Sequence, residues 1–141
     1  MADLRKTFEE MLAEQQDKKP RKHYLDEEHR LQCACIRWYR YQYPNMRHNL
    51  FAVPNGGWRN KAEAGKLKAE GVLPGVADII LLKPNARHGA LLIEMKTPKG
   101  SQQDTQRQWQ KLIEADGYKY VVCRSIDDFM RSVKDYLADT I

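Results

Sequence analysis

Two short apolar runs in the middle of the chain decide the fold, VADIILL at residues 76–82 and ALLIEMK at residues 90–96. The first run is bounded by Pro74-Gly75 and by Pro84-Asn85, and both dipeptides favour turns. Runs of this length that are rich in Ile, Leu and Val predict strands. Because only a short loop separates the two runs, we predict that they pair as antiparallel neighbours.

The pattern on either side of these runs predicts helices and two further strands. Apolar residues at helical spacing indicate the helices, Pro44 closes one of them, and Gly71 and Gly117 are typical helix ends. Ser101 and Asp104 resemble a capping box. The predicted helices span residues 2–17, 25–43, 59–70 and 101–115, with a last helix opening at Ser125, and the other strands span 50–53 and 118–123. This order predicts a mixed α/β domain in which helices cover a small sheet.

The first 22 residues differ from the rest of the chain. The basic run KKPRK at residues 18–22 breaks the first helix, whose apolar stripe is narrow and surrounded by charges. We interpret residues 1–22 as a helical extension with a basic linker and residues 23–141 as the main domain. The extension is a solvated arm, a DNA contact, or a helix that docks on a second copy of the chain.

Length and charge place the chain in a broad class of proteins. It has 141 residues, of which 24 are basic and 19 acidic, and its net charge is +5. A domain of this size buries a substantial core, which disfavours a peptide hormone, a disulfide scaffold and a wholly disordered chain. The basic excess suits a polyanionic partner such as nucleic acid, although many soluble proteins carry the same charge.

Cysteine usage and the N-terminal sequence predict the compartment. No apolar run reaches the ~20 residues of a membrane-spanning helix, and MADLRKTFEE has no apolar core of a secretory signal. The three cysteines, Cys33, Cys35 and Cys123, are an odd set that points to a reducing compartment, and we predict the cytoplasm. Cys33 and Cys35 project about 200° apart on a helix, so they cannot share one zinc ion.

Three ionisable residues interrupt or end the two apolar runs. Asp78 lies inside the first run, whereas Glu94 and Lys96 end the second and project from one face of a strand. If the strands bring Asp78 beside Glu94, the two carboxylates can share a divalent cation such as Mg²⁺. Lys96 can then position a water or a phosphate. The alternative is an ion pair of a carboxylate with Lys96 near a strand end, and the spacing alone leaves both interpretations open.

The flanking residues favour the first interpretation. Pro74-Gly75-Val76-Ala77-Asp78 followed by Ile93-Glu94-Met95-Lys96 is the active-site pattern of the PD-(D/E)XK nuclease superfamily. The chain resembles its VRR-NUC branch over roughly residues 26–137, and residues 1–22 lie outside the resemblance. The other matching features are Glu28 with Leu31-Gln32, the Pro54-Asn55-Gly56-Gly57 turn with Arg59, the KLKAEGV stretch from Lys66 to Val72, a helix with Gln106 and Trp109, and Gly117-Tyr118.

The resemblance implies a restriction-endonuclease-like core, that is, a small central mixed sheet flanked by helices. It implies that Asp78, Glu94 and the main-chain carbonyl of Met95 hold Mg²⁺ or Mn²⁺, and that Lys96 orients or activates the attacking water. The four groups of the implied active site therefore come from the two central strands.

Two helix residues extend the implied site. Glu28 matches the family's helix acid, which can bind a metal through water or bind a second metal, and Gln106 matches a glutamine that contacts the lysine, a water or a phosphate. From the residues alone, Glu28 can also be a surface acid and Gln106 an exposed polar residue of a helix.

The resemblance also implies a DNA substrate. Main-chain amides beside a cation suit a phosphate backbone, and the expected DNA-binding residues are Asn55, Gly56, Gly57, Arg59 and Lys66. Without the resemblance, an ordinary turn and a solvated helix surface explain these residues. We predict a structure-selective endonuclease that acts as a homodimer on branched DNA such as four-way junctions. The alternatives are a non-catalytic nucleic-acid-binding module with the nuclease fold and a subunit that needs a partner.

Overall fold

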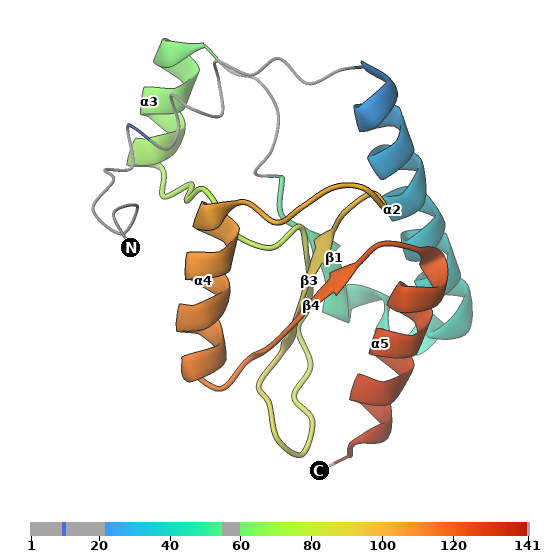
Figure 1. Cartoon of the computed structure of the whole chain (residues 1–141). Coiled ribbons are helices and arrows are strands. Elements are labelled where there is room, and N and C mark those ends of the chain that lie inside the picture. Colours follow the sequence, from blue (N-terminus) through green and yellow to red (C-terminus); the bar gives the residue numbers. More distant parts are fainter. Residues whose placement is uncertain (1–9, 11–21, 55–59, 141) are drawn as a thin grey trace.

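The computed structural model describes residue 10, residues 22–54 and residues 60–140 (Figure 1). In chain order its elements are α2 (Lys22–Gln42), η2 (Pro44–Asn49), β1 (Leu50–Ala52), α3 (Lys61–Ala69), β2 (Ile79–Leu81), β3 (Leu91–Met95), α4 (Asp104–Ala115), β4 (Lys119–Cys123) and α5 (Ile126–Ala138). The predicted helix over residues 2–17 lies, apart from residue 10, outside the described residues. No helix in the described ranges is long and apolar enough to cross a membrane.

The sheet has the strand order β1-β2-β3-β4. β2 pairs antiparallel with both β1 and β3, whereas β3 and β4 run parallel. The predicted antiparallel pairing of the two central runs is therefore confirmed. α4 connects β3 to β4, because parallel neighbours need a crossover connection of about this length.

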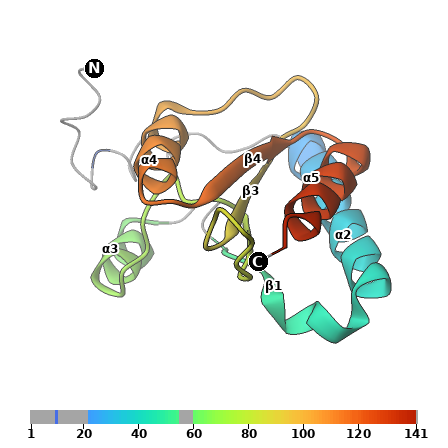
Figure 2. The ribbon, with the colours of Figure 1, turned by 90° about the horizontal axis from the view of Figure 1, so that it is seen from below.

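Helices cover both faces of this mixed sheet. Figures 1 and 2 show α2 and α5 side by side on one face and α4 on the other, while α3 stands farther out. Leu91, Ile93 and Met95 of β3 enter the core that α2 and α5 complete, and Leu92 enters the smaller core beneath α4. This alternation follows the two-residue period of a strand and confirms the predicted α/β class.

The predicted extent of β2 is wrong, for a local reason. The strand covers only Ile79–Leu81 and not residues 76–82. The chain before it turns at Gly75, whose φ is +88° and on which an added Cβ would lie 2.6 Å from the carbonyl oxygen of Thr105 in α4. Residues with positive φ do not continue a strand, so the turn brings the chain against α4 before β2 begins.

Two predicted helix starts are also wrong. α4 begins at Asp104 and not at Ser101, because the N–H of Gln103 donates to Oε1 of Gln106 at 2.8 Å and Gln106 thereby replaces the predicted Ser101–Asp104 capping box. α2 begins at Lys22, three residues before the predicted start, and the unpredicted η2 follows its end. The expected boundary between residues 1–22 and 23–141 stays a prediction.

Candidate active site

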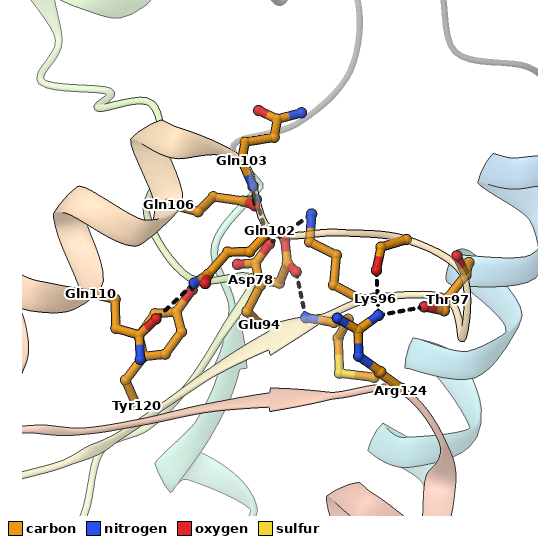
Figure 3. A network of polar contacts seen from close by, with 12 residues as sticks. Asp78, Glu94, Lys96, Thr97, Gln102, Gln103, Gln106, Gln110, Tyr120 and Arg124 are labelled. Carbon is orange, nitrogen blue, oxygen red and sulfur yellow. Dashed lines mark hydrogen bonds and ion pairs between the residues drawn. The ribbon is translucent and has the colours of Figure 1, made fainter. Parts of the chain in front are cut away.

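The two central strands bring Asp78 and Glu94 together. Ile79, the first residue of β2, pairs with Ile93 of β3, so Asp78 comes opposite Glu94. Oδ2 of Asp78 accepts a hydrogen bond of 2.8 Å from the N–H of Met95, which holds this carboxyl group at the end of β3 (Figure 3). The juxtaposition follows from the register of the strands, and it needs no loop to create it.

Glu94 is an ionisable residue in a buried position. Only 2% of its surface is exposed, and burial together with the neighbouring Asp78 charge raises the pKa of Glu94 to about 9. Its Oε1 accepts a hydrogen bond of 2.6 Å from Nε2 of Gln106. Its Oε2 is buried and has no hydrogen-bond partner among the described residues. Ionising a buried carboxyl group of this kind is costly, and among its neighbours Lys96 favours the charged form whereas Asp78 opposes it.

Burial also opposes the ionisation of Asp78, but a main-chain hydrogen bond partly offsets this effect. Burial raises the pKa of Asp78, and the hydrogen bond from the Met95 N–H acts in the opposite direction. The two carboxyl groups are therefore tightly coupled, and without a cation the pair holds its protons more strongly than isolated carboxyl groups do.

Lys96 lies on the same face of the chain as Glu94, as the strand period predicts. Its Nζ is 3.8 Å from Oε1 of Glu94, and the residue is only 7% exposed. Figure 3 shows its ammonium group above the two carboxylates, beside the start of α4. A cation held here can meet a negatively charged atom that approaches the carboxyl pair.

The orientation of the Gln106 amide follows from its two partners. Oε1 of Gln106 accepts the N–H of Gln103, so Nε2 is the atom directed at Glu94. The first turn of α4 thus fixes the position of a donor to the buried carboxylate. The structure places Gln106 in contact with Glu94. The resemblance instead implied a contact of this glutamine with the lysine, a water or a phosphate.

Glu28 approaches the site from α2. Burial raises the pKa of Glu28, the charge of Asp78 raises it further and that of Lys96 lowers it, so the three groups are electrostatically coupled. Within the described part of the chain, however, no three His, Cys, Asp or Glu side chains converge as a metal-binding group. Glu28 therefore lies near the pair without forming a three-ligand group with it, and its two expected roles, binding a metal through water or binding a second metal, stay predictions.

The remaining donors suit a hard divalent cation. Main-chain groups alternate sides along β3, and the N–H of Lys96 donates to the carbonyl of Cys123 in β4, so Met95 faces the opposite side, toward Asp78. The Met95 carbonyl faces that same side, because both main-chain groups of a strand residue point to one neighbour. Two carboxylates, one main-chain carbonyl and retained waters are an Mg²⁺ type of ligand set, and the unpartnered Oε2 of Glu94 fits it.

The expected DNA-binding residues are not all placed. Asn55, Gly56, Gly57 and Arg59 lie outside the described residues. Lys66 is exposed on α3, and the structure shows no direct contact between it and the carboxyl pair. These assignments stay predictions.

Arg124 is a residue of the site region that sequence reasoning missed. It follows β4, and its Nη1 donates to the carbonyls of Thr97, at 3.0 Å, and of Gly100 (Figure 3). Both carbonyls belong to the connection between Lys96 and α4, so Arg124 holds that connection from the neighbouring strand. One arginine after a strand has no periodic pattern that could reveal this contact.

A second missed contact supports the same connection from the α4 side. Nε2 of Gln102 donates to Oε1 of Gln110 at 2.8 Å and to the hydroxyl of Tyr120 at 3.2 Å (Figure 3). Burial and then the charge of Glu94 raise the pKa of Tyr120. Side chains from α4 and β4 therefore position the loop that carries Gln102.

A mixed sheet between helices, with two carboxylates and a lysine at the ends of its central strands, is typical of nuclease-type α/β domains. The VRR-NUC domain family model matches residues 12–127, and the chain belongs to this family. Among solved structures, one described as "VRR_NUC domain protein" is similar, with a TM-score of 0.71 and 22% identity over 80% of this chain and 89% of that chain. At this identity the likeness shows the fold. No curated protein matches the sequence.

Proposed function

We propose that this VRR-NUC domain is a metal-dependent endonuclease that hydrolyses phosphodiester bonds in DNA. The observation that supports it is the convergence of Asp78, Glu94 and Lys96 at the end of β3, with one carboxylate oxygen buried and unpartnered. A purely structural ion pair does not need a second carboxylate beside the first, because like charges oppose each other there.

Asp78, Glu94 and the Met95 carbonyl are the groups that would hold Mg²⁺ or Mn²⁺ in this proposal. When bound, such an ion neutralises phosphate charge and lowers the pKa of a bound water. Lys96 places a second positive charge beside the same phosphate and orients the water, since its ammonium group lies next to Glu94. Gln106 keeps Glu94 in one orientation through its amide.

The substrate that we propose is branched DNA, such as a four-way junction, cut by a homodimer. The resemblance of the sequence supports this choice. Two copies would place two sites on two strands, because a two-fold dimer repeats each site once. Asn55, Gly56, Gly57, Arg59 and Lys66 would contact the backbone, and the cytoplasm is the proposed compartment.

A cleavage panel tests the activity. The purified chain is incubated with linear, flapped and four-way DNA in Mg²⁺, in Mn²⁺ and in EDTA. We expect cleavage of the four-way substrate in either metal and none in EDTA. Binding without cleavage of any substrate would favour the non-catalytic module, whereas activity that appears only after a second protein is added would favour a dependent subunit.

A further inference from the structure

One segment of the chain carries basic residues without any acidic residue. Residues 29–62 contain no Asp or Glu, so the rest of the chain has 18 basic against 19 acidic residues. The net charge of the whole molecule therefore comes from this segment, which forms most of α2 together with η2 and β1. Its basic residues are Arg30, Arg37, Arg40, Arg47, Arg59 and Lys61.

The arginines of this segment differ from those elsewhere in their contacts. Outside the segment, the described arginines have protein partners: an aspartate for Arg87, Arg107 and Arg131, and main-chain carbonyls for Arg124. Within the described ranges, none of the segment's arginines makes an ion pair, and all are exposed. Nε of Arg30 donates to the main-chain carbonyl of Asp26 at 3.2 Å, a contact that leaves the charge of Arg30 without an acidic partner. Guanidinium groups without an ion-pair partner remain available to an anion from outside.

Three of these arginines lie along the outer side of α2. Arg30 and Arg37 are two turns apart, Arg40 follows one turn later, and the buried side chains of the helix face the core instead. Tyr41, next to Arg40, is 87% exposed. Figure 1 shows α2 along the outer side of the molecule. We call Arg30, Arg37, Arg40 and Tyr41 the α2 basic face.

We propose that the α2 basic face binds the phosphate backbone of a DNA arm beyond the bond that is cut. The inference rests on the proposed function for the identity of the polymer. The three arginines span about 15 Å of helix, and duplex DNA carries one charge per ~1.7 Å, so each arginine can meet a phosphate. Glu28, two residues before Arg30, is coupled to Asp78 from the inward side of α2. The basic face is on the opposite side of the helix, so it begins level with the site along the helix axis and leads away from it.

A charge-removal pair tests this proposal. The double variant Arg37→Gln/Arg40→Gln is compared with Arg87→Gln/Lys119→Gln. The second variant removes the same charge from the loop between β2 and β3 and from the first residue of β4. Binding of a long DNA duplex is measured by fluorescence anisotropy in EDTA at several salt concentrations, and circular dichroism verifies folding. We expect the first pair to raise Kd about tenfold and to lower the slope of log Kd against log salt by about 2. We expect the second double variant to keep the Kd and the salt slope of the wild type.

Three results would overturn the proposal: an unchanged slope in the first pair, an equal loss in both pairs, or no binding of duplex DNA by the wild type. A change in self-association of the DNA-free first pair, seen by sedimentation, would also overturn it, because the face would then be a contact between copies. The failure of the proposed function is a separate result. If the first double variant lowers the salt slope but the wild type cleaves no substrate, DNA binding by the α2 basic face is supported and the proposed nuclease activity is contradicted.

Discussion

Asp78 and Glu94 carry two carboxyl groups into a buried position, and the chain compensates them only in part. The Met95 N–H serves Asp78, Gln106 serves one oxygen of Glu94, and Lys96 lies 3.8 Å away. Coupled buried carboxyl groups retain protons until an opposite charge arrives. At the residue scale, the ionised carboxyl pair therefore keeps a negative charge that the proposed cation would compensate.

Asp78→Asn should weaken Mn²⁺ binding more than about tenfold without unfolding the chain. The asparagine keeps an oxygen that can accept the Met95 N–H, so the end of β3 retains its hydrogen bond. Titration calorimetry with Mn²⁺ and thermal unfolding in EDTA measure the two effects. Asp116→Asn, at the exposed end of α4, is the matched control. Equal Mn²⁺ affinity in Asp78→Asn and wild type would contradict the ligand assignment.

Gln106→Ala should slow cleavage about tenfold and destabilise the fold by roughly 1 kcal/mol. The variant removes the donor to Glu94 and the acceptor that caps α4. Cleavage rates over a range of Mn²⁺ concentrations and urea unfolding measure the two losses. Gln108→Ala, on the same helix, should change neither by more than a small factor. A Gln106→Ala protein with the lower stability and an unchanged rate would limit Gln106 to capping.

The charged residues of the site could be predicted from the sequence, but the residues that hold the neighbouring loop could not. Asp78, Glu94 and Lys96 are charges within apolar strand patterns, and such interruptions stand out in a sequence. Arg124 and Tyr120 reach the site region only through the parallel pairing of β3 with β4. That pairing is a tertiary contact, and no local spacing encodes it.

At the element scale, the close approach of the Gly75 turn to α4 sets where β2 can begin. Gly75→Ala should destabilise the fold by ~1–2 kcal/mol for its positive φ and by a further ~1–3 kcal/mol for the clash with the Thr105 carbonyl. Gly71→Ala is the matched control, since Gly71 has φ +97° and nothing within 4 Å of an added Cβ. Urea unfolding of both variants separates strain from clash, and equal losses would contradict the close approach.

The element boundaries differ in how far neighbouring residues determine them. The alternation of β3 and the cap that Ser125 provides to α5 depend on neighbouring residues, and both agree with the sequence patterns. The short β2 depends on Gly75 meeting Thr105 of α4, a contact between distant segments that no local pattern encodes. The start of α4 depends on the cap that Gln106 provides to Gln103, which competes with the Ser101–Asp104 pattern two residues earlier.

At the scale of the whole molecule, the edge of the sheet formed by β1 and β2 exposes apolar side chains. Phe51 and Leu82 are exposed, and the strand register places them on the same face as the half-buried Ile80. A second copy of the chain is the partner that we propose for this face. We expect a dimer by sedimentation at micromolar concentration and a shift to monomer in Phe51→Ser/Leu82→Ser. A wild type that sediments only as monomer would contradict the dimer.

Cleavage and binding can be separated in one lysine variant, because Lys96 is proposed to act on the reacting phosphate and not to hold the DNA arms. Lys96→Ala and Lys111→Ala, an exposed lysine of α4, are assayed with wild type on the four-way junction in Mn²⁺ under single-turnover conditions. We predict that Lys96→Ala loses at least about 100-fold in cleavage rate while its Kd for the junction stays within about threefold, and that Lys111→Ala matches wild type. Cleavage by Lys96→Ala at the wild-type rate would contradict the account.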